Sequence, residues 1–476
     1  MNSQTLFRTT IHLSLAAFLT LSASAADDPF KAGVRPTDKL SPAAQEKTFT
    51  VPAGFKIQLF AAENDIAKPM NLAFDERGRV WATVTKEYPT AAPLDKPGRD
   101  SIKVLEDTTG DGRADKITTF VDGLNIPIGI YPYQGGCIAW SIPYLWHFKD
   151  NDGDGKCDER VKLYGPLDHT RDTHGMNSSF TRGFDGWLYI THGFRNQSKF
   201  KGADGNEVEL NSGNTYRIQL DGSRVEHFTH GQVNPFGMCI DPWGNLYTAD
   251  CHSSPVYQLI RNGQYPGFGR AHDGLGFTPL VIQHTHDSTA ISGIVYVDND
   301  SWPKEFQNNV LIGNVMTSRV NRDRIDFHGA SPKGTELPDL VKTTDPWFRP
   351  VNLQMGPDEK LYIADFYNKI IGHYEVPLDH PGRDRESGRI WSLTYLGNPH
   401  LTEERTLPAL DDTGGWFRDL NHANLSRRML ATHHLADSGD EAAASKAREI
   451  VLSADASEHA SAHALWILHR RDGLDS

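Results

Sequence analysis

The chain has 476 residues, of which 38% are hydrophobic, 42 are glycine and 27 are proline. This length allows one large β-domain with a smaller appendage, and long helical patterns are scarce until about the last sixty residues. The net charge of −13 argues against a surface that follows nucleic-acid phosphates, so we expect no nucleic-acid partner.

Residues 1–25 have the pattern of a cleavable signal peptide. Arg8 gives the positive flank, Ile11–Leu21 the apolar run, and Ala23-Ser24-Ala25 the small-residue cleavage pattern. The run is too short to cross a bilayer, and no later segment has the roughly 18 uninterrupted apolar residues of a spanning helix. We therefore expect cleavage near Ala25, a periplasmic or secreted product with no transmembrane segment in this chain, and a linker over residues 26–44.

A hairpin pattern recurs along the chain at a spacing of about 55 residues. Its turns are found in FDERGRVWATV, GFDGWLYITHG, CIDPWGNLYTAD, YVDNDSWP and MGPDEKLYIAD, at Asp75, Asp185, Asp241, Asp298 and Asp358. From Asp185 onward these turns are 56, 57 and 60 residues apart. The first interval spans two periods, so a sixth turn is expected near Tyr131.

Six antiparallel units at this spacing predict an all-β, six-bladed β-propeller over residues 45–397, because each blade buries its faces against its neighbours. Phe49–Phe60 is expected to join the last blade near Arg389–Tyr395. Closing the ring in this way removes exposed edge strands.

The chain changes character after Gly397. We expect a linker over residues 398–420, followed by helical periodicity at Asn421–Ala436, Glu441–Leu452 and Glu458–Arg471. Paired helices of this length suggest a short α-helical segment, residues 421–476, that begins a HEAT-like solenoid and is cut short.

Four cysteines are too few for a disulfide scaffold. An oxidising compartment would permit one or two bridges. The pairs nearest in sequence are Cys137 with Cys157 and Cys239 with Cys251, although connectivity stays open. There is no CxxCH motif, so we expect no covalent haem in this chain.

Two acidic loops are candidate calcium sites. DNDGDGKCD places carboxylates at its first, third, fifth and ninth positions, a spacing that can wrap a hard cation, and DTTGDGRAD is a weaker version one blade earlier. The carboxylates are Asp150, Asp152, Asp154 and Asp158 in the first loop, and Asp107, Asp111 and Asp115 in the second. The alternative is a solvated acidic turn. Either loop would lie between two strands of a blade, where a structural role is more natural than catalysis.

Polar residues flanking the hairpins are expected to face the central channel, because the innermost strand of each blade lines it. The candidates are Asn71, Asn125, His174, Asn177, His192, Asn234, Asp250, His252, His286, Ser288, Arg349, Asn352, Asp365 and Asn368. Converging imidazoles, amides and an arginine could bind a polar ligand and move a proton. Alternatively, the asparagines only satisfy backbone groups.

The sequence HTHD brings His284, His286 and Asp287 together. These residues could hold a metal ion, although the fixed spacing of a zinc motif is absent.

Four segments resemble a known family: THGMNSSFTRGFDGWLYITHG, VNPFGMCIDPWGNLYTADCHSSP, NVMTSRVNRDRI and DPWFRPVNLQMGPDEKLYIADFYNKIIGHYEVPLDHPGRDRESGRIW. Through them the chain from about Phe49 to Tyr395 resembles the propeller of the membrane-bound dehydrogenase group of Planctomycetes and Verrucomicrobia. That group is similar in turn to soluble pyrroloquinoline-quinone (PQQ) glucose and sorbosone dehydrogenases.

The resemblance implies PQQ and Ca²⁺ as cofactors and His174 as the base that takes the substrate hydroxyl proton. Asn234, Arg349 and Asn177 are the implied cofactor contacts. Val233 stands where the family has a cofactor-contacting arginine, and the family's cofactor lysine has no clear equivalent.

The function expected from this resemblance is an exported quinoprotein-like dehydrogenase. It would oxidise a sugar or another hydroxyl or aldehyde compound and pass electrons to PQQ and then to an external acceptor such as a cytochrome c. The alternative, motivated by Val233, is a non-catalytic, calcium-stabilised propeller that binds carbohydrate or a protein partner. A hydrolase or lyase has least support, because no pair of acids is placed as general acid and base.

Overall fold

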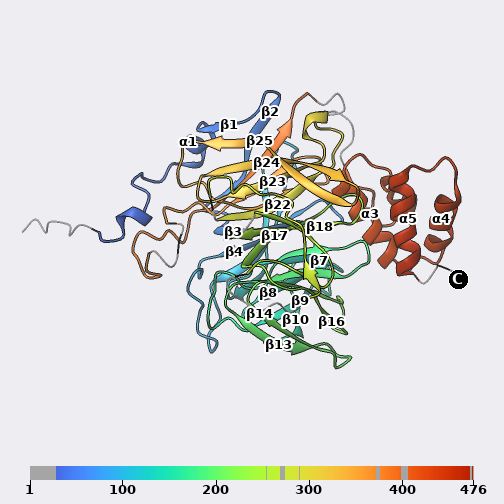
Figure 1. Ribbon diagram of the computed structural model, residues 1–476, viewed down its shortest axis with the longest axis horizontal. Helices are drawn as coiled ribbons and strands as arrows, with labels where there is room; N and C mark the ends of the chain where they lie inside the picture. The colour runs from blue at the N-terminus through green and yellow to red at the C-terminus, as the bar shows by residue number, and fades with distance from the viewer. Residues whose placement is uncertain are drawn as a thin grey trace, which may run out of the picture.

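The computed structural model (Figure 1) describes residues 28–252, 255–267, 274–288, 290–370, 372, 376–397, 406–471 and 474. The expected signal peptide lies outside these residues. Within them, no helix is long and apolar enough to cross a membrane.

Six antiparallel sheets form the blades of a propeller. The first blade consists of β3 (Lys68–Phe74), β4 (Val80–Thr85), β5 (Asp100–Glu106) and β6 (Lys116–Leu124). The second consists of β7 (Ile130–Tyr133), β8 (Gly136–Ser141), β9 (Tyr144–Lys149) and β10 (Glu159–Tyr164). The third consists of β11 (Ser178–Arg182), β12 (Leu188–His192), β15 (Asn214–Ile218) and β16 (Val225–Thr229), with the hairpin β13 (Gln197–Lys201) and β14 (Glu207–Asn211) inserted.

The remaining blades follow the same plan. The fourth consists of β17 (Asn234–Ile240), β18 (Leu246–Cys251) and β19 (Val256–Leu259), followed by the short pair β20 (Gly263–Gln264) and β21 (Gly276–Phe277). The fifth consists of β22 (Ile291–Val297), β23 (Asn309–Asn314), β24 (Arg319–His328), β25 (Ser331–Thr343) and β1 (Phe49–Thr50), with the 3-10 turn η2 (Lys304–Phe306). The sixth consists of β26 (Pro350–Met355), β27 (Leu361–Asp365), β28 (Arg389–Tyr395) and β2 (Phe55–Ala62).

The innermost strands β3, β7, β11, β17, β22 and β26 each contact the next, and β26 contacts β3. This closed ring of six confirms the predicted six-bladed propeller.

Several of the recurring aspartates stabilise the turns of the inner hairpins. Asp75 Oδ1 accepts hydrogen bonds from two backbone N–H groups of its own turn, and Asp241 Oδ1 does the same. The turn expected near Tyr131 lies between β7 and β8 and needs no aspartate. Its residues Gln134 and Gly135 both have positive φ, 50° and 80°, as a tight two-residue hairpin turn requires.

The ring is closed by two short strands instead of the one predicted over Phe49–Phe60. Strand β2 pairs with β28, with Phe55 opposite Tyr395, which confirms the predicted closure of the last blade. Strand β1 pairs instead with β25 of the fifth blade. The break between them falls at Pro52-Ala53-Gly54, where proline cannot donate to a ladder and Gly54 has a φ of 83°.

In the part of the chain that the structure describes, four helices follow the propeller: α2 (Thr413–Asp419), α3 (Leu425–Asp437), α4 (Ala442–Leu452) and α5 (Glu458–Arg470). The last three match the predicted helical periodicity. Helix α2 was not predicted, because two glycines follow its first residue; the side chain of Asp412 caps its N-terminus. Trp416 of α2 packs with α3, α4 and α5 in a separate apolar core.

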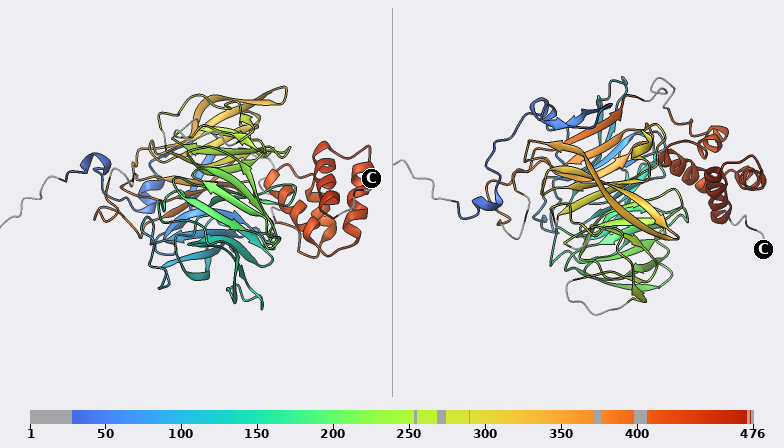
Figure 2. Two further views of the ribbon diagram at one scale, coloured as in Figure 1. Left: turned by 60° about the horizontal axis from the view of Figure 1, so that its bottom comes forward. Right: turned by 45° about the horizontal axis from the view of Figure 1, so that its top comes forward.

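The two ends of the chain lie on opposite sides of the propeller (Figures 1 and 2). The N-terminal segment, residues 28–47, contains η1 (Lys31–Gly33) and α1 (Pro42–Glu46). The helices α2–α5 lie at the other end of the channel, where Leu425 and Met429 of α3 line a second cavity together with Phe74 and Met355, the last residues of β3 and β26.

None of the four cysteines forms a disulfide in the described part of the chain, so neither bridge allowed by the sequence is present. Cys137 is buried within the second blade and Cys239 within the fourth. These thiols act as small apolar side chains of the core.

Candidate functional site

A cavity of about 450 Å³ lies at the end of the channel where the inner strands begin. Met70, Phe236 and Phe366 give it apolar walls, while His174, Asn234 and Arg349 are among its polar lining. Three of the four residues expected at the catalytic and cofactor site therefore line one cavity. A mostly apolar pocket of this size with a few convergent polar groups is the usual form of a small-molecule site.

His174 is held by its own loop and by a loop of the first blade. Its backbone N–H donates to Asp172 Oδ1 at 2.6 Å, and its Nδ1 forms a hydrogen bond with Tyr88 Oη. Thr173 Oγ1 donates to Pro89 O, which fixes the Tyr88 loop beside it. The imidazole lies nearly parallel to the Phe236 ring, with centroids 6.4 Å apart. The imidazole therefore has a fixed orientation at the cavity wall.

Arg349 is the most unusual group of the cavity, because its guanidinium is buried yet only partly bonded. Its Nη1 donates to Ser318 Oγ at 3.0 Å and to Phe348 O at 2.8 Å. Its Nε and Nη2 have no hydrogen-bond partner among the described residues, although the side chain is only 2% exposed. Burial, reinforced by the nearby charge of Arg35, lowers the pKa of Arg349 to about 9. Two unsatisfied donors on a buried cation favour an anionic ligand.

Asn234 lines the cavity from the start of β17. Its backbone N–H donates to Asp250 Oδ1 at 2.7 Å, and its own Oδ1 accepts from the Phe194 N–H at 3.3 Å. Val233 stands where the PQQ dehydrogenases that the chain resembles have an arginine. It is buried, and its N–H donates to Asp250 Oδ2. This blade therefore contributes an amide to the cavity and no charge from position 233.

Asn177 does not line the cavity. Its side chain is fully buried, and its Oδ1 accepts a hydrogen bond from Tyr216 Oη at 2.8 Å within the third blade. Its position just before β11 directs the side chain into the blade.

The N-terminal segment forms part of the cavity rim. Ala32, Gly33 and Arg35 line the cavity, and the Arg35 N–H donates to Lys369 O at 3.0 Å. Residues 28–44, expected to be a linker, therefore pack against the propeller.

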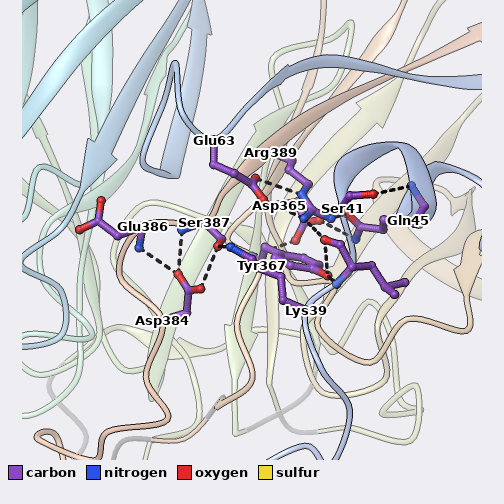
Figure 3. A network of polar contacts seen from close by, with 12 residues as sticks. Lys39, Ser41, Gln45, Glu63, Asp365, Tyr367, Asp384, Glu386, Ser387 and Arg389 are labelled. Atoms are coloured by element: carbon purple, nitrogen blue, oxygen red, sulfur yellow. Dashed lines mark hydrogen bonds and ion pairs between the residues drawn. The ribbon is translucent and has the colours of Figure 1, made fainter.

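A polar network fastens this segment to the sixth blade (Figure 3). Arg389 pairs with Glu63 at 2.9 Å and donates to Gln45 Oε1, while Gln45 Nε2 donates to Asp365 Oδ2 at 3.0 Å. Asp365 Oδ1 in turn accepts the backbone N–H of Arg349 at 2.8 Å. The N-terminal segment is thus linked, through two side chains, to the backbone of the cavity arginine.

Lys68, which is buried, forms an ion pair 3.3 Å long with Asp384, a partly exposed residue that lines the cavity. Burial lowers the pKa of Lys68 to about 8, although Asp384 opposes this effect. Burial would raise the pKa of Asp384, but the charge of Lys68 and hydrogen bonds from Ser387 outweigh it and lower that pKa. Lys68 Nζ also donates to three backbone carbonyls, so its contacts are those of a structural cation.

Other channel-facing candidates mostly join one blade to the next. Asn71 Oδ1 accepts the Gly129 N–H of the second blade at 2.8 Å, and Asn352 Oδ1 accepts the Leu72 N–H of the first blade at 3.0 Å. These asparagines satisfy buried backbone groups, as the alternative interpretation held. Of the remaining candidates, His252 and Asn368 line the cavity.

The first acidic loop, between β9 and β10, gathers three of its four predicted carboxylates. Ligand atoms of Asp150, Asp152 and Asp158 lie within 4.8 Å of one another, and Asp154 is not part of this cluster. Asp150 also accepts the backbone N–H groups of Gly153 and Gly155, which shapes the turn.

The second acidic loop, between β5 and β6, gathers no such cluster among the described residues. Asp107 accepts the N–H groups of Gly110 and Gly112, and Asp115 accepts bonds from Thr108, while Asp111 accepts the N–H of Arg113. These carboxylates are occupied by the backbone and side chains of their own turn.

Tyr88 and Arg35 are among the cavity residues that the sequence did not indicate. Tyr88 lies in an irregular loop after β4, and Arg35 lies in the segment expected to be a linker. Neither falls at a hairpin boundary, which was the signal used to select channel residues, so periodicity alone cannot find them.

The fold and the cavity define this protein as a six-bladed β-propeller with a candidate ligand site at one end of its channel. Residues 41–396 match the family described as a domain of unknown function, DUF7133, and the chain belongs to this family.

Over 169 residues the chain is 24% identical to the aldose sugar dehydrogenase YliI of Escherichia coli K12, a match covering 31% of this chain and 42% of that protein. The match thus spans less than half of the relative. It confirms the expected resemblance to sugar dehydrogenases.

Two solved structures are similar at low identity. One is a carbohydrate-active enzyme of family AA12 from Trichoderma reesei, with 13% identity, a TM-score of 0.48, and coverage of 75% of this chain and 100% of that chain. The other is the PQQ-bound aldose sugar dehydrogenase of Streptomyces coelicolor, with 16% identity, a TM-score of 0.46, and coverage of 72% and 99%.

Proposed function

We propose that this protein is a dehydrogenase that oxidises a hydroxyl group of a sugar or a similar compound, with PQQ as its cofactor. The main support for this proposal is Arg349, which lines the same cavity as His174. Its guanidinium is buried, and its Nε and Nη2 have no hydrogen-bond partner among the described residues. The sequence relative that is named an aldose sugar dehydrogenase supports the same class of reaction.

The cavity residues fit a planar polyacid such as PQQ. Phe194, Phe236 and Phe366 offer flat apolar surfaces, and Arg349 with the nearby Arg35 offers positive charge. An anion between these two arginines would relieve the repulsion that contributes to the lowered pKa of Arg349. Arg349 and Asn234 would hold the cofactor, which when bound supplies the acceptor of a hydride.

His174 is the group suited to take the hydroxyl proton. To accept it at Nε2, the imidazole must carry its own hydrogen on Nδ1 and donate that hydrogen to Tyr88 Oη. Tyr88 would then fix the tautomer and orientation of the base. The stacked Phe236 ring would limit access of water from one side.

Calcium in this proposal binds the first acidic loop, through Asp150, Asp152 and Asp158. The loop joins two outer strands of the second blade, so the ion would stabilise that blade. We also propose that the protein is exported and passes its electrons to an external acceptor such as a cytochrome c.

The test is a fluorescence titration of the purified protein with PQQ, in the presence and absence of Ca²⁺, followed by turnover assays on a panel of aldoses with an artificial electron acceptor. Arg349→Gln should weaken PQQ binding about 10- to 100-fold, because hydrogen bonds to charged groups contribute about 1.5–3 kcal/mol. Arg324→Gln is the matched control, since Arg324 is exposed on β24.

Absence of PQQ binding, or equal binding by Arg349→Gln and the unmodified chain, would refute the proposal.

Val233 favours the second candidate, a non-catalytic propeller that binds carbohydrate or a protein partner, because this position brings no charge to the cavity. Carbohydrate binding on a glycan array, without redox turnover of any aldose, would support that candidate.

A further inference from the structure

The fifth blade carries four titratable side chains that lie close together outside the channel cavity. His284 and His286 are in the segment before β22, Asp323 is on β24 and Glu336 is on β25. Asp323 and Glu336 are direct partners across the β24–β25 ladder. None of the four lines the cavity described above, so the proposed function does not account for them.

The polar atoms of this histidine–carboxylate cluster converge. The two Nε2 atoms of His284 and His286 are 3.2 Å apart, and each lies 2.7 Å from a different oxygen of Asp323. His286 Nδ1 is 3.4 Å from Glu336 Oε1. Ligand atoms of His284, His286 and Glu336 all lie within 4.8 Å of one another.

Hydrogen bonds account for only part of these contacts. Each neutral imidazole can donate one hydrogen bond from Nε2 to the nearer oxygen of Asp323, which leaves a lone pair on its Nδ1. His286 Nδ1 is buried and makes no hydrogen bond with the described residues. Two acids directly opposite each other on paired strands also repel. A divalent cation would accept the lone pairs and neutralise both acids.

The turn at His286-Asp287, just before β22, places the His286 side chain beside strand β24. His286 and Asp287 have φ values of 52° and 56°, in the left-handed region that non-glycine residues seldom adopt. Asn314 Nδ2 donates to His286 O at 3.1 Å and holds the turn. Asp287, the third residue considered in HTHD, is exposed, and the acids near the histidines come from outer strands instead.

We propose that His284, His286 and Glu336 form a binding site for a borderline divalent metal ion of the Zn²⁺ class, with Asp323 orienting the two imidazoles through their Nε2 atoms. Two imidazoles with one carboxylate are a ligand set for zinc, whereas calcium prefers oxygen ligands alone. The segment that carries the histidines leads into β22, whose residues Ile291 and Ser292 line the channel cavity. The ion would fasten that segment to the outer strands of the blade.

The test uses the full chain, freed of metal with a chelator and dialysed. On addition of Zn²⁺ we expect uptake of one equivalent and a higher melting temperature. With Co²⁺ in place of Zn²⁺ we expect visible absorption bands of a four-coordinate ion. His284→Gln and Asp323→Asn should each weaken zinc binding at least 10-fold, and His328→Gln, an exposed histidine of β24, should not.

His284→Gln changes a partly exposed loop residue, so the variant is expected to fold even if Asp323→Asn, which alters a fully buried group, does not. Melting of each variant in chelator checks this. Failure of the unmodified chain to take up zinc at micromolar concentration would overturn the proposal. Equal uptake by His284→Gln and the unmodified chain would overturn it as well.

Discussion

The hydrogen bond between Tyr88 and His174 lets us predict how substitution of either residue changes turnover. If His174 is the base, Tyr88→Phe removes the hydrogen bond at Nδ1 that helps to orient the ring. We expect a fall in kcat of about 10-fold, equivalent to about 1.4 kcal/mol, with little change in cofactor affinity. His174→Ala should abolish turnover.

The measurement for this pair is steady-state kinetics across pH 5–9 with the cofactor-loaded enzyme. Tyr144→Phe is the control, because Tyr144 lies on β9 away from the cavity. Full activity of His174→Ala would contradict the assignment of the base.

The same residues show how far sequence reasoning can locate a site. His174, Asn234 and Arg349 were selected because they precede inner strands, and all three line one cavity. Asn177 has a similar sequence context, but its side chain turns into the blade, and only packing against Tyr216 decides this. Tyr88 comes from a loop 86 residues before His174, a contact that periodicity cannot reveal.

At the scale of elements, the blade-linking asparagines are expected to contribute to stability. Asn352→Ala would leave the buried N–H of Leu72 without its acceptor. An unsatisfied buried group costs about 1–3 kcal/mol, so we expect a lower denaturation midpoint in guanidinium chloride with an unchanged slope. Asn206→Ala, at an exposed turn, is the control and should have little effect. Equal midpoints for the two variants would contradict this role.

Three histidines of the C-terminal segment are held neutral: His433 of α3, His463 of α5, and His422, which lies between α2 and α3. His463 Nε2 accepts from Arg428 Nε at 3.3 Å, and His422 Nδ1 accepts from the Asn424 N–H at 3.0 Å. Burial, together with Arg427 and Arg428, lowers the pKa of His422 to about 4, and burial lowers the pKa of His433 and His463 well below 6.5.

Because the pKa values of these histidines are lowered, we expect the C-terminal helices to lose stability in mild acid. Because each folded-state pKa lies below the unfolded value, the stabilising contribution is complete above pH 6.5 and is lost as the pH falls toward 4. For His422 alone the loss approaches about 3 kcal/mol. Asp419 opposes it, since burial raises the pKa of that carboxyl.

Hydrogen exchange at pH 7 and pH 4.5, corrected for intrinsic rates, should show loss of protection in α3 and α5 before the blades. His422→Gln should reduce this difference, whereas His469→Gln, at an exposed position of α5, should not. Equal acid sensitivity of helices and blades would contradict the prediction.

The elements themselves were predicted where one physical signal dominates. Inner hairpins repeat because apolar strands alternate with aspartate turns, and this pattern is local enough to read from the sequence. The division of Phe49–Phe60 between two blades depends on which partner strand is nearest, which is not a local property. Helix α2 depends on Trp416 packing against the other helices, which outweighs the low helix propensity of its two glycines.

In the whole molecule, the N-terminal segment and the C-terminal helices lie at opposite ends of the channel, as Figure 1 shows. The N-terminal segment lies at the rim of the cavity, and α3 covers the opposite end. A ligand of the cavity is therefore expected to enter on the side of the N-terminal segment. The network of Arg389, Gln45 and Asp365 links that segment to the backbone of Arg349, so ring closure and cavity geometry depend on the same side chains.

At the end of the channel opposite the cavity, Asp437 joins the C-terminal helices to the propeller. Its carboxylate pairs with Arg182 of β11 and with Arg470 of α5, each at 2.5 Å. Arg182 is 8% exposed, so Asp437→Asn would leave a nearly buried guanidinium without its counter-charge. Removing one partner of a fully buried pair costs about 3–5 kcal/mol, and partial exposure of Asp437 reduces this to about 1–3 kcal/mol.

We expect Asp437→Asn to uncouple the helices from the propeller. Calorimetry should then resolve two unfolding transitions in the variant, with the helices melting first, where the unmodified chain gives one. Asp455→Asn changes an exposed carboxylate of the same helical segment and should leave a single transition. A single transition at an unchanged temperature in Asp437→Asn would mean that apolar contacts of Phe184, Leu425 and Met429 hold the two parts together without the ion pair.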